Sequence, residues 1–163
     1  MLKRLVAGGL GLGVAAWAGI AGVDSTTRDD AGQITVQGEL GVFVTQLGDC
    51  LNEVPGGTAV EVSTVTGVPC DQPHHWQLIH KGDITLEAYS RSAVNDEKTK
   101  ICTAAIEELF TSFVNANDEE IIEYKNAEGY TLAPTSESWE NGDRTVDCLI
   151  GSETEFYTGS LLD

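Results

Sequence analysis

The stretch NDEKTKICTAAIEELFTSF at positions 95–113 decides the fold class, because the hydrophobic period becomes helical here. Its apolar residues recur at spacings of three and four, which place them on one face of an α-helix. Asn95 is a suitable N-cap, and Asp96 and Glu97 would face the positive end of the helix. We therefore predict one main amphipathic helix. Its expected buried face consists of Ile101, Cys102, Ala105, Ile106, Leu109, Phe110 and Phe113.

On both sides of this helix, the chain shows short apolar or alternating segments bounded by turn residues, which is typical of β-strands. Before the helix, Pro-Gly-Gly at 55–57 predicts a chain reversal. The fold expected from strands around a single helix is α+β: a mostly antiparallel sheet with one main helix packed on it. The expected strands are 42–51, 59–65, 76–80, a weaker one at 83–89, two short segments at 121–124 and 130–133, and a last strand at 145–150.

Four cysteines, at positions 50, 70, 102 and 148, predict a domain held by two disulfides. None lies within three residues of another, so the chain has neither a paired-cysteine zinc knuckle nor a redox Cys-x-x-Cys. Four cysteines allow three connectivities. We favour Cys50 with Cys70, which flank one turn-rich stretch, and Cys102 with Cys148, which would tie the helix to the last strand. Nested and crossed pairings remain alternatives.

An uncharged run of 19 residues, 5–23, follows Lys3 and Arg4. As a helix it would be about 28 Å long, close to the thickness of a bilayer's hydrocarbon core. Its six glycines weaken it as a span, and Ala16-Trp17-Ala18 has the small residues that a signal peptidase reads. We expect an N-terminal hydrophobic helix that anchors the chain in the membrane, with a cleaved signal peptide and secretion as the alternative. Either way, the basic N-terminus would be cytoplasmic and the rest extracytoplasmic.

The predicted domain organisation has three parts. Residues 1–23 are the transmembrane anchor or signal peptide, 24–40 are a polar tether without sustained periodicity, and 41–163 are the extracytoplasmic domain. The whole chain carries 26 acidic against 9 basic residues, a formal net charge of −17. Because phosphate backbones are bound by clustered Lys and Arg, this charge excludes nucleic acid as a partner. It favours solubility and points only weakly to cationic partners.

The histidines at positions 74, 75 and 80 are the candidates for a metal site. Imidazoles beside Asp71 and Asp83 could hold zinc with an open position for a hydrolytic water. In a strand, however, His74 and His80 would lie about 20 Å apart, and His74 and His75 would point to opposite faces. We therefore expect no metal and no cofactor. His74, which follows Pro73, is interpreted as a structural imidazole that hydrogen-bonds nearby groups at the disulfide corner.

Two further residues, Trp139 and Arg144, are candidates either for ligand binding or for structure. Trp139 follows a Pro-Thr-Ser-Glu-Ser turn, where a Trp more often plugs the edge of a core than stacks on a ligand. Arg144 is expected to pair with Asp143 or Glu140, although an arginine could instead receive an anionic wall fragment. No Gly-x-Ser-x-Gly motif is present, so nucleophilic catalysis has no support.

The cysteine-containing segments and the C-terminal third carry a resemblance to a known family. The residues concerned are Gly48-Asp49-Cys50-Leu51, Val68-Pro69-Cys70-Asp71-Gln72-Pro73-His74, Cys102, Pro134-Thr135-Ser136-Glu137-Ser138-Trp139, Gly142-Asp143-Arg144-Thr145-Val146-Asp147-Cys148-Leu149 and Thr158-Gly159-Ser160-Leu161. From about Gly41 to the C-terminus, the chain resembles the actinobacterial septum-formation domain family. The resemblance implies a membrane-tethered or exported domain linked to division septa. It transfers the cysteines and the Pro-His corner but no catalytic mechanism.

These observations predict a noncatalytic extracytoplasmic envelope protein that takes part in septum formation or cell division. It would act by binding an envelope protein or a cell-wall component. The alternative is a metal-dependent cell-wall hydrolase that uses His74, His75 and His80.

Overall fold

The computed structural model of the 163-residue chain describes residues 23–54, 61–116 and 126–162. The predicted anchor or signal peptide therefore lies, apart from Val23, outside the described residues. So do the extended segment expected at 121–124 and the first two residues of the strand expected at 59–65. Within the described ranges, no helix combines the length and the apolar composition needed to cross a bilayer.

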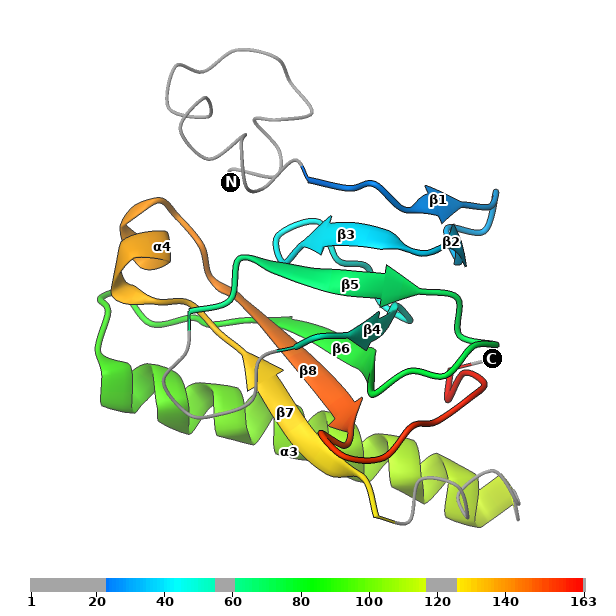
Figure 1. Cartoon of the computed structure of the whole chain (residues 1–163). Helices are drawn as coiled ribbons and strands as arrows, with labels where there is room; N and C mark the ends of the chain where they lie inside the picture. The colour runs from blue at the N-terminus through cyan, green and yellow to red at the C-terminus, as the bar shows by residue number, and fades with distance from the viewer. Residues whose placement is uncertain (1–22, 55–60, 117–125, 163) are drawn as a thin grey trace.

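Six of the described strands form one antiparallel sheet in the order β3-β5-β4-β6-β8-β7 (Figure 1). The two longest strands, β6 and β8, pair along their lengths, with a β-bulge between Leu78 and His80. The last strand begins at Thr145, as the alternation of apolar residues predicted. The six strands are β3 (Gly38–Gly41), β4 (Cys50–Asn52), β5 (Thr64–Val68), β6 (Trp76–Asp83), β7 (Glu128–Leu132) and β8 (Thr145–Gly151).

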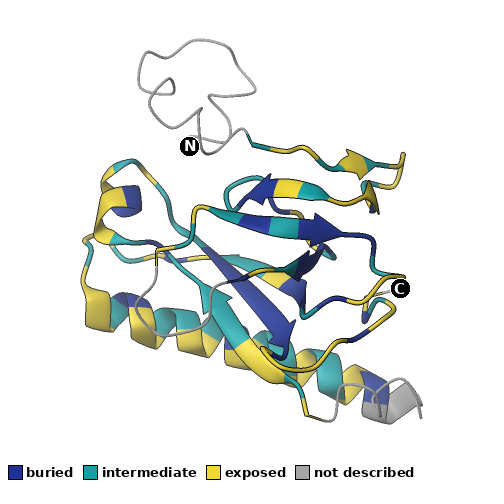
Figure 2. Cartoon of the chain, in the orientation of Figure 1, coloured by how far each residue is buried: buried dark blue, intermediate teal, exposed yellow. Residues whose placement is uncertain are grey.

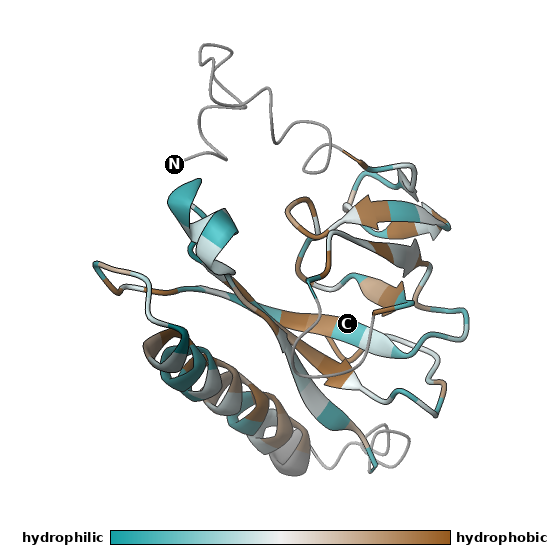
Figure 3. Cartoon of the chain, turned by 60° about the vertical axis from the view of Figure 1, so that its left-hand side comes forward, coloured by the Kyte–Doolittle hydropathy of each residue, from teal (hydrophilic) through white to brown (hydrophobic). Residues whose placement is uncertain are grey.

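Helix α3 (Arg91–Ala116) lies across one face of this sheet, against β6, β7 and β8 (Figure 3). Its buried side chains include Val94, Cys102 and Phe113, and Ile101, Ile106, Leu109 and Phe110 pack against the same core. A second, five-residue helix, α4 (Ser136–Glu140), precedes β8. The prediction of an α+β fold with a mostly antiparallel sheet and one main helix is confirmed.

The start of the main helix was predicted one turn too late. Helix α3 begins at Arg91, so Asn95 lies inside it rather than at its N-cap. Ser90 precedes the helix, and its hydroxyl lies 3.5 Å from the backbone nitrogen of Ala93, in the position of a capping group. Glu97 accepts hydrogen bonds of 2.9 Å from the backbone and the hydroxyl of Thr85, which ties the first turns to the preceding loop.

The sheet buries apolar side chains on both faces, and Figure 2 shows β8 buried along most of its length. The face that carries α3 contributes alternate residues of β8, from Val146 to Ile150. The opposite face is covered partly by the N-terminal segment and has its own cluster. That second cluster consists of Ile34, Leu40, Leu51, Val54, Val65, Trp76, Leu78 and Leu149.

The segment 24–40, predicted as a polar tether, is folded into the domain. It contains β1 (Thr27–Arg28), β2 (Ile34–Val36) and most of β3. Ile34 and Leu40 are buried in the second cluster. The guanidinium of Arg28 donates to both carboxylate oxygens of Asp49, at 2.6 and 2.9 Å. The prediction was wrong because two buried apolar residues six positions apart are too few to show the hydrophobic period of a strand or a helix. They are nevertheless enough to hold very short strands against the domain.

Two of the expected strands are also corrected. Residues 42–44 form a turn rather than a strand, with the amide of Val44 donating to the carbonyl of Gly41 at 3.0 Å, and β4 begins only at Cys50. The weak strand expected at 83–89 is absent from the described chain there: β6 continues to Asp83, and a loop leads to α3.

Candidate functional site

The two disulfides join the pairs favoured from the sequence. Cys50 bonds Cys70, with 5.2 Å between their Cα atoms, and Cys102 bonds Cys148, with 5.3 Å. The second bridge ties α3 to β8, as expected. The first joins the start of β4 to the loop that follows β5, and this loop leads directly into the Pro73-His74 corner. The disulfide pairing is therefore confirmed.

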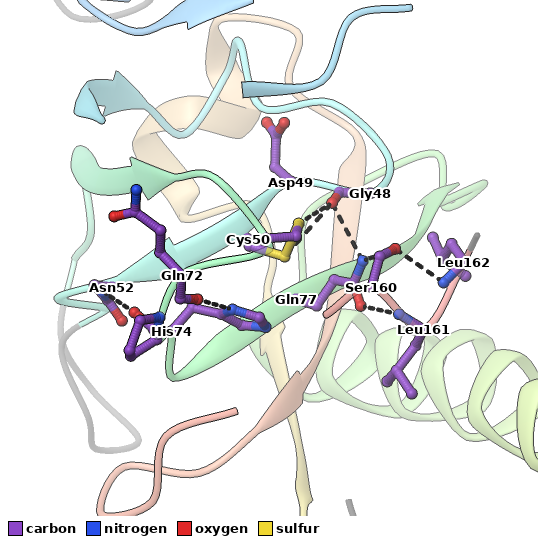
Figure 4. Close-up of a disulfide and its surroundings, with 12 residues drawn as sticks. Gly48, Asp49, Cys50, Asn52, Gln72, His74, Gln77, Ser160, Leu161 and Leu162 are labelled. Atoms are coloured by element: carbon purple, nitrogen blue, oxygen red, sulfur yellow. Dashed lines mark hydrogen bonds between the residues drawn. A yellow bond between two sulfur atoms is a disulfide. The ribbon is translucent and has the colours of Figure 1, made fainter. Parts of the chain in front are cut away.

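The corner after Pro73 is built around the imidazole of His74, which is fully buried (Figure 4). Its Nδ1 lies 2.9 Å from the carbonyl oxygen of Gln72, so Nδ1 carries the proton and donates it. The backbones of His74 and Tyr157 exchange two hydrogen bonds, of 2.9 and 2.8 Å. His74 thus makes the hydrogen bond to nearby backbone that the sequence analysis expected at this corner. Burial lowers the pKa of His74 below its usual value, because a protonated ring would lose its hydration.

Because His74 is buried as a neutral imidazole, the free energy of unfolding is expected to decrease when the pH is lowered. Below about pH 6.5 the unfolded chain binds a proton at this position that the folded chain resists, so the folded state loses stability as the pH falls. Between about pH 7.5 and 5.5 this single group would lower the unfolding free energy by at most about 1.4 kcal/mol. Urea unfolding of the wild type and His74→Gln at both pH values measures it. The loss should shrink in His74→Gln and persist in His80→Gln, because His80 is exposed; equal losses in all three proteins would contradict this account.

Gln77, which the sequence analysis did not single out, clamps the C-terminal tail to the sheet (Figure 4). Its buried amide donates to the carbonyl of Gly48 at 3.3 Å and to the hydroxyl of Ser160 at 2.8 Å, and it accepts from the backbone of Leu161 at 2.7 Å. Leu161 is buried in the helix-side core. The available signal was a glutamine between Trp76 and Leu78 in an otherwise apolar run, since a buried amide needs partners.

A shallow groove of about 520 Å³ lies beside this corner, and hydrogen bonds at the corner hold one wall of the groove in place. The amide of Asn52 accepts from the backbone of His75 at 2.8 Å and donates to the carbonyl of Pro73 at 3.2 Å. These bonds connect the end of β4 to the start of β6. The groove is lined by Asn52, Glu53, Val54, His75, Trp76, Glu153 and Phe156.

An exposed aromatic ring projects at the rim of this groove. Phe156 is 61% exposed and packs on the imidazole of His75, with 4.0 Å between ring centroids. The Nδ1 of His75 lies 3.0 and 2.9 Å from the carbonyls of Ser152 and Glu155, to which it donates. At the end of β8, a Cβ on Gly151 would lie 1.8 Å from the carbonyl oxygen of His75, so only glycine permits this approach. The phenyl ring therefore packs on an imidazole that is itself hydrogen-bonded to two backbone carbonyls.

The charge of the groove is negative. Glu53 and Glu153 line it, and none of the lining residues that the structure describes is Lys or Arg. Glu53 has a left-handed backbone, with φ 55°, and its carboxylate accepts from the hydroxyl of Thr66 at 2.6 Å. Burial, followed by the charge of Glu153, raises the pKa of Tyr130, whose ring packs near Trp76 with 5.3 Å between centroids. A second hollow of about 360 Å³ adjoins the groove and is lined by Glu39, Glu53, Thr64, Val65 and Thr66.

Trp139 and Arg144 lie at the other end of β8 from the groove. Arg144 precedes β8 and Gly151 ends it, so about 20 Å separates the two positions. Trp139 is buried in the helix-side core, as predicted. Arg144, however, donates to the carbonyl oxygens of Trp139 and Asp143, and its Cζ lies 3.4 Å from the centroid of the Trp139 ring. The carboxylate pairing predicted for Arg144 is replaced by these contacts, because the chain turns back over the indole.

The segment before Trp139, interpreted from the sequence as a turn, is the capped start of α4. Thr135 is the N-cap and Ser138 completes a capping box with it. Ser138 is buried, and its hydroxyl donates to the carboxylate of Asp143 at 2.9 Å. Burial raises the pKa of Asp143, while the bonds from Thr145 and Ser138 oppose that rise. The Thr-x-x-Ser spacing was the signal available in the sequence.

The three histidines do not converge on one point. His74 is buried in the corner, His75 supports Phe156, and His80 is exposed on β6 opposite Cys148. Within residues 23–54, 61–116 and 126–162, no group of three His, Cys, Asp or Glu side chains is placed to hold a metal ion.

The fold and the groove define a small disulfide-bridged α+β domain with an acidic, aromatic surface groove. A family model described as septum formation matches residues 20–150, and the chain belongs to this family. The match begins before the N-terminal strands rather than near Gly41, so it includes the segment predicted as a tether. Comparison with curated proteins and with solved structures gave no significant match.

Proposed function

We propose that this protein is a noncatalytic envelope domain that takes part in septum formation by binding a protein or cell-wall partner through the groove beside the disulfide corner. Family membership supports the septal role. The observation that carries the binding role is the exposed ring of Phe156, held on His75 beside Glu53 and Glu153. Exposed apolar patches mark interaction sites, and aromatic side chains are enriched among the residues that dominate binding energy.

The proposed location is the outer side of the cell membrane, with residues 5–23 as a single-pass anchor; secretion after cleavage is the alternative. All four cysteines are paired. Structural disulfides of this kind persist in oxidising compartments outside the cytoplasm. The basic residues Lys3 and Arg4 before the apolar run support a cytoplasmic N-terminus.

A binding role fits the polar groups of the groove better than catalysis does. The amide of Asn52 and the Nδ1 of His75 are hydrogen-bonded to backbone groups, so they shape the wall. The alternative of a metal-dependent hydrolase is not favoured, since its three histidines occupy separate positions. Stoichiometric zinc in the purified full-length chain, lost in His80→Ala, would reinstate it.

The test is complementation in the native host. Cells that lack the protein are expected to form fewer or misplaced septa, and full-length wild type should restore them. Phe156→Ala should fail to restore septation at equal protein level. Leu47→Ala is the matched control, because Leu47 is also an apolar residue with 61% exposure but lies outside the groove. Normal septa in the deletion strain, or full complementation by Phe156→Ala, would contradict the proposal.

A further inference from the structure

We propose that the partner of the groove is a basic polypeptide segment, whose Lys or Arg side chains lie against Glu39, Glu53 and Glu153 and whose apolar parts pack on Phe156. This inference rests on the proposed function and names the chemistry of the partner.

The shape of the surface favours a polypeptide over a single amine. The groove of about 520 Å³ and the adjoining hollow of about 360 Å³ share Glu53 as a lining residue, so they are neighbours on the surface. A ligand that fills both hollows needs several side chains, as an extended peptide has.

The charges of the surface favour a cationic partner. Three carboxylates, those of Glu39, Glu53 and Glu153, line the two hollows, and among the described residues no lysine or arginine lines either one. Two of the chain's nine basic residues, Arg28 and Lys81, are already paired with carboxylates elsewhere. With a net charge of −17, the chain attracts cations generally. The groove adds specific positions to this general attraction.

The aromatic ring supplies the apolar half of the recognition. Lys and Arg carry long apolar stems that pack along hydrophobic surface while the charged head meets a carboxylate. A cation near an aromatic face also gains electrostatic attraction. Phe156, held at 4.0 Å from the ring of His75 and placed with Glu153 in one groove, offers both contacts to one side chain.

The experiment measures binding of a fluorescein-labelled lysine-leucine peptide to the purified full-length chain in neutral detergent, by fluorescence anisotropy. Wild type should bind this peptide and not the glutamate-leucine analogue, with affinity falling as salt is raised. Because exposed ion pairs are individually weak, Glu53→Gln with Glu153→Gln should reduce affinity by about fivefold. Phe156→Ala should also weaken binding, whereas Leu47→Ala should not.

The matched charge control is Glu107→Gln with Glu108→Gln, which makes the same change in net charge on exposed positions of α3. Equal weakening by the two double variants would show diffuse attraction and overturn the inference. Tighter binding of a muropeptide with a free ammonium group at the same groove would assign the site to wall material and overturn it too. If wild type binds neither labelled peptide while Phe156→Ala still fails in complementation, the inference fails and the septal role stands. If wild type binds the lysine-leucine peptide but Phe156→Ala complements fully, only the septal role of the groove is rejected, and the basic partner assigned to the groove stands.

Discussion

Replacing Cys102 and Cys148 together by alanine is expected to lower the free energy of unfolding by about 4 kcal/mol, the larger of the two disulfide effects. The bridge joins residues separated by 46 positions and connects α3 to β8, which pairs with both β6 and β7. Without it, the unfolded chain regains the entropy that this long closed loop removes. The measurement is urea unfolding of the double variant against wild type, without reductant.

The matched comparison is the double alanine variant of Cys50 and Cys70. That bridge closes a shorter loop, with a separation of 20 positions, so its removal should cost about 3 kcal/mol. The variants therefore test both the size and the order of the two losses. A loss below about 1 kcal/mol for the bridge between α3 and β8 would show that packing alone holds the helix on the sheet.

Replacing Asp147 by alanine is expected to lower the unfolding free energy by about 3 kcal/mol, because it removes one charge of a mostly buried ion pair. The Nζ of Lys81 lies 2.5 Å from one carboxylate oxygen of Asp147 and donates to the hydroxyl of Thr45 at 2.9 Å. The hydroxyl of Thr45 lies 2.8 Å from the other carboxylate oxygen. Only 19% of the Lys81 side chain is exposed. Urea unfolding at neutral pH measures the loss.

The control for this prediction removes both charges. Lys81→Met combined with Asp147→Leu should cost much less than Asp147→Ala alone, because no uncompensated charge remains and apolar side chains of similar volume fill the space. The double variant separates the cost of removing one charge of the pair from the cost of losing the pair itself. If it is as unstable as the single variant, the loss comes from packing and the electrostatic explanation is wrong.

The main helix could be predicted from the sequence because its apolar residues recur with the helical period over several turns. The last strand could also be predicted from a local period, because Val146, Cys148 and Ile150 occupy alternate positions along it. The start of α3 was missed because Val94, which extends the buried face, lies about two turns upstream of the first apolar pair, Ile101 and Cys102.

The groove and the clamps around it could not be predicted in this way. Gln77 bonds the backbone of Leu161 across 84 positions, and Phe156 packs on His75 across the end of the sheet. Each of these side chains is unremarkable within its own segment. Their roles depend on where β4, β6 and the C-terminal tail meet.

By itself, the sequence determined the fold class, the main helix and the last strand, and it favoured, without determining, the two disulfide pairs that the structure shows. These follow from local periods, and from cysteines placed beside turns and on predicted elements. Only the tertiary structure decided that residues 24–40 join the domain, that Arg28 pairs with Asp49, and that Glu53, His75, Glu153 and Phe156 share one groove. The physical reason is that such contacts join distant parts of the chain, and no local period records which distant side chains will meet once the sheet closes.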